Sequence, residues 1–131
     1  MRVERQLSLI IDNRPGVLAD VCGDLARAKI GITAINVENL VDHSAVRLIV
    51  DDPDKATHLL GTGGVLVFEN EVIAVSIPNK PGALAALARR LGAARVNIDY
   101  MYGSTADRGK ATVYLRVSNP KRALDALKRK R

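Results

Sequence analysis

The sequence predicts an α+β fold made of two tandem copies of one small unit, and two observations indicate this. The first is an internal repeat, because Asn-Arg-Pro-Gly at residues 13–16 recurs as Asn-Lys-Pro-Gly at residues 79–82, an offset of 66. The second is that the same order of apolar patterns surrounds each tetrapeptide, with a short branched run before it and a helical pattern after it. The repeat divides the 131-residue chain into two domains, 1–69 and 70–131.

Each copy begins with a short run rich in branched apolar side chains, which is typical of a β-strand. These runs are residues 7–11 and 72–77. The Pro-Gly pair then ends the strand, and proline is tolerated in the first turn of a helix because its missing N–H would have no partner there. The helix that follows in each copy is predicted by apolar residues at helical spacing, which are Val17, Leu18, Val21 and Leu25 in the first and Leu84, Leu87, Ala88 and Leu91 in the second.

The remaining elements follow in the same order in both copies. Residues 32–40 and 45–50 predict a strand hairpin in the first copy, and residues 98–102 and 111–117 predict one in the second, with turns at 42–44 and 107–109. Asp52 and Asn119 each precede a proline, so each predicts the N-cap of a second helix. Residues 65–68 predict a closing strand. The resulting order is βαββαβ, the ferredoxin-like pattern, with helices on one face of an antiparallel sheet.

The second copy has no residues left for a fourth strand after its second helix. An unpaired sheet edge is usually paired or covered. We therefore expect a strand from a partner to complete this edge, as in a homo-oligomer. A short bare edge guarded by nearby Lys and Arg is the alternative.

Composition limits the class of protein. Hydrophobic residues make up 47 % of the chain, which suits a packed core, and the single cysteine, Cys22, excludes an intramolecular disulfide. No stretch resembles a signal peptide and no apolar run approaches the ~20 residues that span a bilayer. We therefore expect a cytoplasmic protein that does not contact membranes.

Charge is distributed unevenly along the chain. Residues 1–66 carry seven basic and nine acidic side chains, whereas residues 67–131 carry thirteen basic and five acidic ones, including the basic tail 128–131. Such a tail is typical of a solvated helix end, where cations are favoured by the helix dipole, or of a segment that contacts an acidic partner.

The chain lacks a recognisable catalytic or metal-binding pattern. Cys22 aligns with Ala88 and suits a small core position, and His43 and His58 have no ligand spacing to a cysteine or to each other. The glycine-rich stretch 61–64 follows a helix and lacks the Lys of a phosphate loop. We expect no catalytic residue, no metal and no cofactor.

The repeated Asn-x-Pro-Gly loop has chemistry suited to an amino acid. Backbone N–H groups at a helix start favour an anion, and Gly16 and Gly82 allow a ligand to approach the backbone closely. The amides of Asn13 and Asn79 offer both a donor and an acceptor. A carboxylate on the N–H groups and an ammonium on amide or carbonyl oxygens would satisfy such a loop.

The chain resembles a tandem pair of ACT domains. The resemblance rests on residues 12–19 followed by Ala-Lys-Ile-Gly-Ile at 28–32, and on residues 79–85 followed by Ala-Arg-Val-Asn-Ile at 94–98. It implies a small free-standing regulatory protein that binds an amino acid where ACT domains pair side by side, with a homodimer and a regulated enzyme as possible partners. The ligand-binding residues that it implies are Asn13, Pro15, Gly16, Val17, Leu18, Asn79, Pro81, Gly82, Ala83, Leu84 and Asn97.

The resemblance also implies that the two copies are unequal. Serine-sensing relatives use an Asn just after the first helix, which is present here only as Asn97, because the first copy has Gly31. If the copies pair, Asn13 would face Asn97 across the fuller of two sites. Such relatives often have His two residues before the motif Asn, where this chain has Ile11 and Ile77, which disfavours serine. Tyr100 alternates with Tyr102 on one face of a strand and is a further candidate for the wall of a ligand pocket.

Other functions remain as alternatives. The Asn-x-Pro-Gly loops can be turn chemistry alone, in which case the protein is a ligand-free interaction scaffold. Some RNA-binding domains share this topology, but they stack bases on paired aromatics, which the predicted strands lack, so nucleic acid is not the expected partner. Acylphosphatases also share the topology, but the loops here lack their arginine signature.

Overall fold

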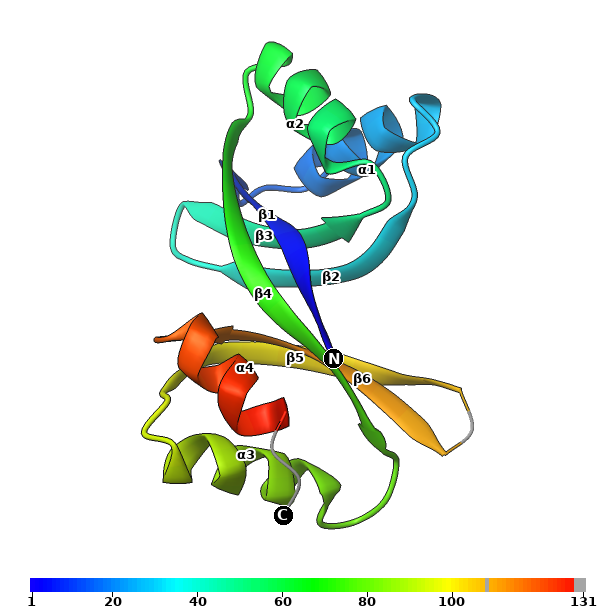
Figure 1. Cartoon of the computed structure of the whole chain (residues 1–131). Helices are drawn as coiled ribbons and strands as arrows, with labels where there is room; N and C mark the ends of the chain where they lie inside the picture. The colour runs from blue at the N-terminus through cyan, green and yellow to red at the C-terminus, as the bar shows by residue number, and fades with distance from the viewer. Residues whose placement is uncertain (108, 129–131) are drawn as a thin grey trace. The chain divides into compact units, whose positions relative to one another are not determined.

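The structure, a computed structural model of the whole chain, describes residues 1–107 and 109–128 (Figure 1). The predicted turn at 107–109 and the basic tail at 128–131 include Arg108 and residues 129–131, which lie outside the described residues. The described part contains six strands and four helices. Their bounds are β1 (Arg2–Asp12), α1 (Val17–Arg27), β2 (Ile32–Asn39), β3 (His43–Val50), α2 (Pro53–Thr62), β4 (Leu66–Pro78), α3 (Ala83–Ala93), β5 (Ile98–Asp107), β6 (Lys110–Val117) and α4 (Pro120–Lys128).

The chain divides into two compact units. The first unit is Arg5–Asn70, and the second unit is Met1–Glu4 together with Glu71–Arg131. The strand order is β2-β3-β1-β4 in the first unit and β1-β4-β6-β5 in the second. Hairpins β2–β3 and β5–β6 are antiparallel, as are the pairs β1–β3 and β4–β6. The predicted α+β fold with two ferredoxin-like units is therefore confirmed.

Strands β1 and β4 are long, with 11 and 13 residues, and each contributes to both units. The sequence predicts separate strands at 65–68 and 72–77, whereas the structure joins them into the single strand β4. The connecting residues 69–71 are Glu-Asn-Glu, which contain neither proline nor glycine. Nothing in them forces a turn, so the extended backbone continues.

The fourth strand of the second unit comes from the start of the chain. Met1–Glu4 belongs to that unit, and β1 is the neighbour of β4 in the strand order. The sequence predicts a strand from a partner chain at this edge, whereas the structure has β1 of the same chain there. It also assigns Met1–Glu4 to the first domain, 1–69, whereas the structure groups these residues with the second unit. The physical reason is that a hydrophobic pattern reports which face of a strand is buried, but not which distant strand lies beside it.

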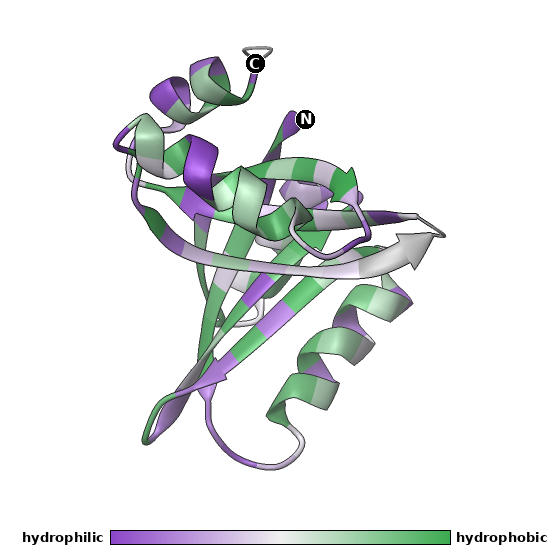
Figure 2. Ribbon diagram, turned by 90° about the horizontal axis from the view of Figure 1, so that it is seen from below, coloured by the Kyte–Doolittle hydropathy of each residue, from purple (hydrophilic) through white to green (hydrophobic). Residues whose placement is uncertain are grey.

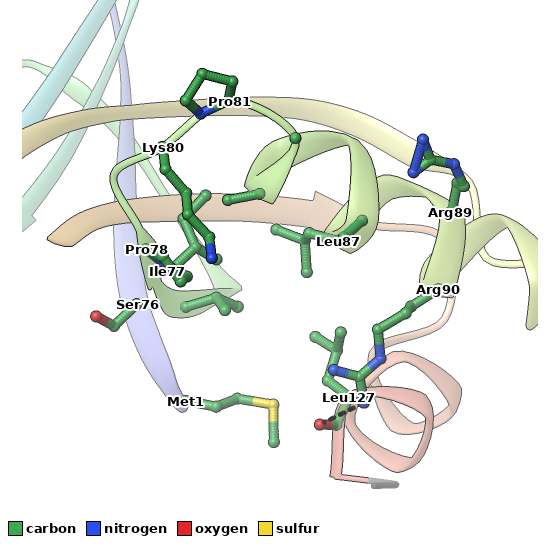
Figure 3. A pocket seen from close by; sticks show the side chains of 14 residues that line it. Met1, Ser76, Ile77, Pro78, Lys80, Pro81, Leu87, Arg89, Arg90 and Leu127 are labelled. Carbon is green, nitrogen blue, oxygen red and sulfur yellow. Dashed lines mark hydrogen bonds between the residues drawn. The ribbon is translucent and has the colours of Figure 1, made fainter. Parts of the chain in front are cut away.

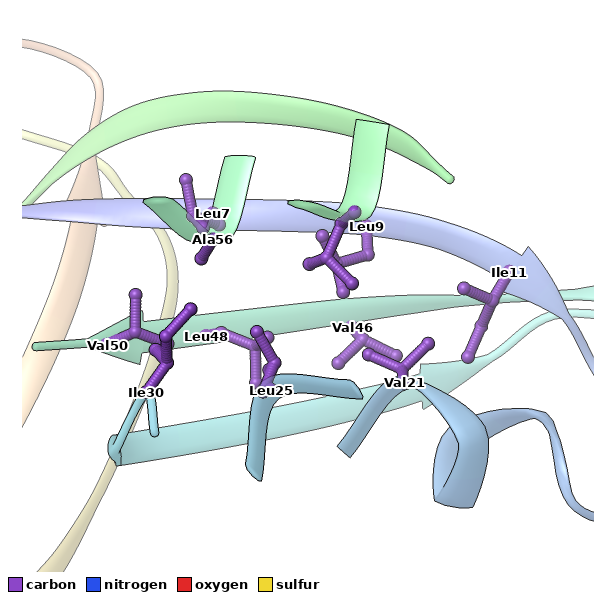
Figure 4. Close-up of a cluster of buried hydrophobic side chains, with 11 residues drawn as sticks. Leu7, Leu9, Ile11, Val21, Leu25, Ile30, Val46, Leu48, Val50 and Ala56 are labelled. Carbon is purple, nitrogen blue, oxygen red and sulfur yellow. The ribbon is translucent and has the colours of Figure 1, made fainter. Parts of the chain in front are cut away.

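Each unit has its own core between its sheet and its two helices. In the first unit, side chains of β1 and β3 meet those of α1 and α2 (Figure 4). The helices are amphipathic and show hydrophilic and hydrophobic segments in turn along the ribbon (Figure 2). The most deeply buried core side chains are Leu7, Leu9, Leu25, Val46, Leu48, Ala56 and Leu60 in the first unit and Ile73, Leu91, Leu115 and Ala123 in the second.

The second helix of each unit begins where the sequence predicts. The Asp52 carboxylate accepts a hydrogen bond from the backbone N–H of Lys55 at 3.1 Å, at the start of α2. The Asn119 side-chain oxygen accepts one from the N–H of Arg122 at 3.0 Å, at the start of α4. Each cap satisfies a donor that the helix itself leaves without a partner, so both predicted caps are confirmed.

Candidate functional site

The first Asn-x-Pro-Gly loop is tied to the β2–β3 hairpin. The backbone N–H of Asn13 donates to the carbonyl oxygen of Asp42 at 3.1 Å, and its side-chain Nδ2 donates to the carbonyl oxygen of Leu40 at 3.0 Å. These bonds hold the amide group of Asn13 in one orientation. The amide oxygen, Oδ1, is the end that remains for another donor.

The hairpin beside this loop carries its own charge pair. His43 Nδ1 lies 2.7 Å from Asp42 Oδ1. This hydrogen bond lowers the pKa of the Asp42 carboxyl, with a smaller contribution from the backbone of Asp42 itself. Asp42 therefore holds its negative charge at neutral pH next to Asn13.

The first helix of each unit starts without a side-chain cap. Gly16 and Gly82 precede α1 and α3 in the left-handed conformation, with φ of 91° and 90°, and neither position has a capping side chain. A side chain at either glycine would be strained, and a carbon built there meets no atom within 4 Å. The N–H of Val17 donates to the carbonyl oxygen of Arg14 at 3.5 Å and that of Ala83 to the carbonyl oxygen of Lys80 at 3.3 Å, so an anion would bind the N–H groups of the residues that follow.

Residues after the glycines differ between the units. Val17 and Leu18 are half-buried and pack against the core of the first unit, and Pro15 is exposed. In the second unit Ala83 is half-buried and Leu84 is 47 % exposed. The second helix start therefore offers more surface to a ligand than the first.

The second loop borders a small hollow of about 250 Å³. Asn79, Ala83 and Leu84, three of the predicted ligand residues, lie on one side of it, and Gly103 and Ser104 of β5 lie on the other. The backbone N–H of Asn79 donates to the carbonyl oxygen of Gly109 at 2.9 Å, which ties this loop to the β5–β6 turn. The structure thus brings the second loop and one strand of its own sheet to a common hollow.

Sequence reasoning missed part of this hollow. Ser104 has no repeat counterpart that singles it out, but glycine inside a strand is a signal of close backbone approach, and Gly103 is such a residue. A carbon built on Gly103 would lie 2.5 Å from the carbonyl oxygen of Thr112. Lys80, the variable residue of the second tetrapeptide, also lines the hollow.

A larger hollow of about 820 Å³ lies on the other side of the same loop. It is lined by the predicted residues Pro81, Gly82 and Ala83, together with parts of β4, α3 and α4 (Figure 3). Lys80 and Ala83 line both hollows. The second Asn-x-Pro-Gly loop therefore separates two possible binding places.

Asn97 does not lie beside Asn79 within the second unit. Its backbone N–H donates to Ser118 Oγ at 3.0 Å and its Nδ2 donates to Asp99 Oδ1 at 3.1 Å. Asn97 thus contacts the β6–α4 connection, whereas Asn79 contacts the β5–β6 turn. The predicted pairing of Asn13 with Asn97 across copies is not tested by either unit and stays a prediction.

Gly31, the counterpart of Asn97, has a different partner. Its backbone N–H donates to Asp51 Oδ2 at 3.0 Å, and a carbon built on Gly31 would lie 2.8 Å from that oxygen. A side chain at residue 31 would therefore require the Asp51 carboxylate to move.

Tyr100 lies outside both hollows. It is half-buried and stands opposite Arg116 on β6. Its neighbour on the same face, Tyr102, stacks on Tyr114 with ring centroids 5.4 Å apart. The role of Tyr100 as a pocket wall remains a prediction.

Within residues 1–107 and 109–128, no three His, Cys, Asp or Glu side chains are grouped so that they could hold a metal ion. Over the same residues, every helix is too short or too polar to cross a bilayer.

A family model and a solved structure both match nearly the whole chain. A family model described as an ACT domain pair matches residues 1–131. The crystal structure of protein BT0572 from Bacteroides thetaiotaomicron is 37 % identical, with a TM-score of 0.92, over 96 % of this chain and 87 % of that one. No curated protein sequence matches the chain at a significant level.

More distant structures share the fold. The regulatory subunit of aspartate kinase from Thermus thermophilus is 19 % identical, with a TM-score of 0.69, over 97 % of this chain and 95 % of that one. The corresponding subunit from Thermus flavus is 19 % identical, with a TM-score of 0.66, over 96 % of this chain and 93 % of that one. At these identities the likeness establishes the fold alone.

Proposed function

This chain belongs to the family of ACT domain pairs, and on that premise we propose that it is an amino-acid-binding regulatory protein rather than an enzyme. The observation that carries the proposal is the uncapped start of α3 beside a hollow bordered by Asn79 and Ser104. A carboxylate would bind the first-turn N–H groups of α3, where the helix dipole favours negative charge. The ammonium would bind the side-chain oxygens of Asn79 and Ser104.

The size of the hollow favours a small amino acid. Its volume of about 250 Å³ lies just below the roughly 300–1,000 Å³ usual for ligand pockets. Leu84 and Val113 supply an apolar wall for a short side chain. We expect the main chain of the ligand to provide most of the polar recognition.

The regulatory role follows from linkage. A ligand that binds one packing of the domains more tightly than another shifts the population towards the first, and a partner enzyme can respond to that shift. Two proteins of similar fold are regulatory subunits of aspartate kinase, which supports a regulated enzyme as the partner class. The hollow at Asn79 and Ser104 lies within the second unit, and a site between paired ACT domains, which the resemblance implies, stays a prediction.

We also propose that the protein forms a homodimer through β2. This strand stands at the edge of the sheet, and three of its apolar side chains are exposed: Ile32 at 38 %, Ile35 at 43 % and Val37 at 42 %. A long apolar edge favours pairing with another strand. Light scattering of the wild-type protein should give twice the mass of one chain. The Ile35→Lys variant should give the mass of a single chain. A wild-type mass of one chain at 100 μM would contradict the proposed dimer.

A ligand-free interaction scaffold is the second candidate function, and a hydrogen bond in the first Asn-x-Pro-Gly loop favours it. The Asn13 amide already bonds to Leu40, so in the first unit the Asn can serve to hold the hairpin. In a scaffold, both asparagines would matter for stability and neither would matter for ligand binding. Variants of the two residues therefore separate the candidates.

The first experiment is a thermal-shift screen of the full chain against the twenty amino acids. A ligand that binds only the native state adds about 2.7 kcal/mol of stability at 100 times its Kd, which raises the Tm by several degrees. Asn79→Ala should abolish the shift. Asn13→Ala is the matched variant and should retain the shift, whereas a fuller site at Asn13 and Asn97, which the resemblance implies, would make this variant the one that loses binding. Equal loss of binding in both would contradict a single competent site. If no amino acid at millimolar concentration changes the Tm, the ligand-free scaffold becomes the favoured function.

A further inference from the structure

The larger hollow of the second unit combines an apolar floor with cationic edges. Its volume is about 820 Å³, within the roughly 300–1,000 Å³ of small-molecule sites. Met1, Leu87 and Leu127 turn towards its centre, and Lys80 and Arg90 extend along its border (Figure 3). None of the described residues that line it is acidic.

The corresponding part of the first unit is filled. There Val65, Val67 and Leu59 pack against the core, and Leu60 is only 1 % exposed. In the second unit Ala126 takes the place of Leu59 in the alignment of the two copies, and Leu127, the counterpart of Leu60, remains half-buried. Leu127 therefore borders a hollow in the second unit, whereas its counterpart Leu60 belongs to the closed core of the first.

The charges at this place are inverted between the units. The alignment of α1 with α3 pairs Asp20 with Ala86 and Asp24 with Arg90. Asp24 forms an ion pair with Arg27 in the first unit. The corresponding place in the second unit therefore favours anions more than that in the first.

Arg90 is held in place by α4. Its Nη2 donates to the carbonyl oxygen of Ala126 at 2.9 Å and to that of Leu127 at 3.0 Å. These bonds fix the guanidinium next to the apolar floor. Lys80 forms no ion pair with any residue that the structure describes, so its ammonium is available to a ligand. Arg89 points away from the centre of the hollow (Figure 3).

We propose that this hollow is a second ligand site, which binds an aliphatic monocarboxylate. The carboxylate binds the Lys80 ammonium at the border that also carries Arg90, because hydrogen bonds between charged groups are stronger than neutral ones. The hydrocarbon chain covers Leu87, Leu127 and Met1. An amino acid is a poorer ligand here, because its ammonium would lie next to two cations without an acidic side chain to receive it. This hollow shares Ile77, Pro78, Lys80 and Ala83 with the hollow at Asn79 and Ser104, but Leu87, Arg90 and Leu127 line only this one.

The experiment measures binding of four-, six- and eight-carbon carboxylates to the full chain by titration calorimetry. Each buried methylene should raise the affinity about fourfold. Octylamine should not bind, octan-1-ol should bind at least tenfold more weakly than octanoate, and leucine should bind at least tenfold more weakly than 4-methylpentanoate. Absence of octanoate binding at 10 mM, or equal binding of octanoate and octan-1-ol, would overturn the proposal.

Variants locate the site. Lys80→Ala should weaken octanoate binding ten- to a hundredfold, as expected for a hydrogen bond to a charged group. Arg14→Ala removes the corresponding cation of the first unit and should leave binding unchanged. Ala86→Phe should fill the hollow and abolish binding, and because Ala86 is exposed, the Tm should stay within 3 °C of the parent. Equal losses in Lys80→Ala and Arg14→Ala would contradict this location.

The second ligand site and the amino-acid site can fail separately. Asn79→Ala should retain full octanoate binding while it loses the amino-acid response. Loss of both responses in this variant would show one shared site and would overturn the proposal of a separate one.

Discussion

Gly103 is a strand residue whose surroundings leave no room for a side chain. It lies on β5 opposite Val113 of β6, and a Cβ at this position would meet backbone on one side and a branched side chain on the other. The contacts would be 2.5 Å to the carbonyl oxygen of Thr112, 2.7 Å to Val113 Cγ1 and 2.9 Å to Val113 Cα. We therefore predict that Gly103→Ala destabilises the second unit.

The magnitude follows from these distances. Non-bonded carbon atoms are most stable at about 3.5–4.0 Å, so each contact would be shorter than optimal by roughly 0.6 Å or more. Two of the three atoms belong to the backbone of a paired strand and move only with the ladder. Overpacking of this kind costs about 1–3 kcal/mol. The Tm should fall by roughly 3–15 °C for a chain of this size.

Gly92 is the matched control, because the same substitution there should have the opposite sign. It lies in α3, is exposed, and a Cβ on it meets no atom within 4 Å. Gly92→Ala should stabilise the protein by about 0.4–1 kcal/mol through helix propensity and the reduced freedom of the unfolded chain. Urea unfolding followed by far-UV circular dichroism measures both variants. A Gly103→Ala midpoint equal to that of the parent would refute the reasoning from close contact.

Three further predictions concern the first unit. Arg5 donates to Asp54 at 2.6 Å and to Glu69 at 3.0 and 2.8 Å, and it lowers the pKa of both carboxyls. The stabilisation by these ion pairs is fully present above the unfolded pKa of the two carboxyls, about 4, and is lost as the pH falls through their lower pKa values in the folded protein. Arg5→Ala should therefore lower the urea midpoint more at pH 7 than at pH 2.5. A loss that does not depend on pH would contradict the role of these ion pairs. Asp52→Ala should cost about 1 kcal/mol in urea unfolding by loss of the α2 cap, and Asp52→Asn should restore most of it; no loss in the alanine variant would argue against the cap. Leu25→Ala should cost about 2–5 kcal/mol in the same assay, since Leu25 is fully buried, and a smaller loss would indicate that the core collapses around the cavity.

Much of the candidate site could be predicted from the sequence. The repeat at 13–16 and 79–82 identifies both loops, and the left-handed glycines with their uncapped helices have the geometry that Pro-Gly after a strand indicates. Ser104 could not be assigned, because a strand residue enters a hollow through the register of β5 and β6, and register depends on pairing between strands.

The sequence by itself determined the order of the elements, their caps and the equivalence of the two copies. These depend on local patterns: apolar spacing, Asp or Asn before proline, and glycine after it. Only the tertiary structure decided that residues 65–78 form one strand and that Met1–Glu4 joins the second unit. It also decided that Leu127 borders a hollow, whereas its counterpart Leu60 lies in the core of the first unit. Strand partners and packing volumes depend on residues far apart in the chain, which no local pattern records.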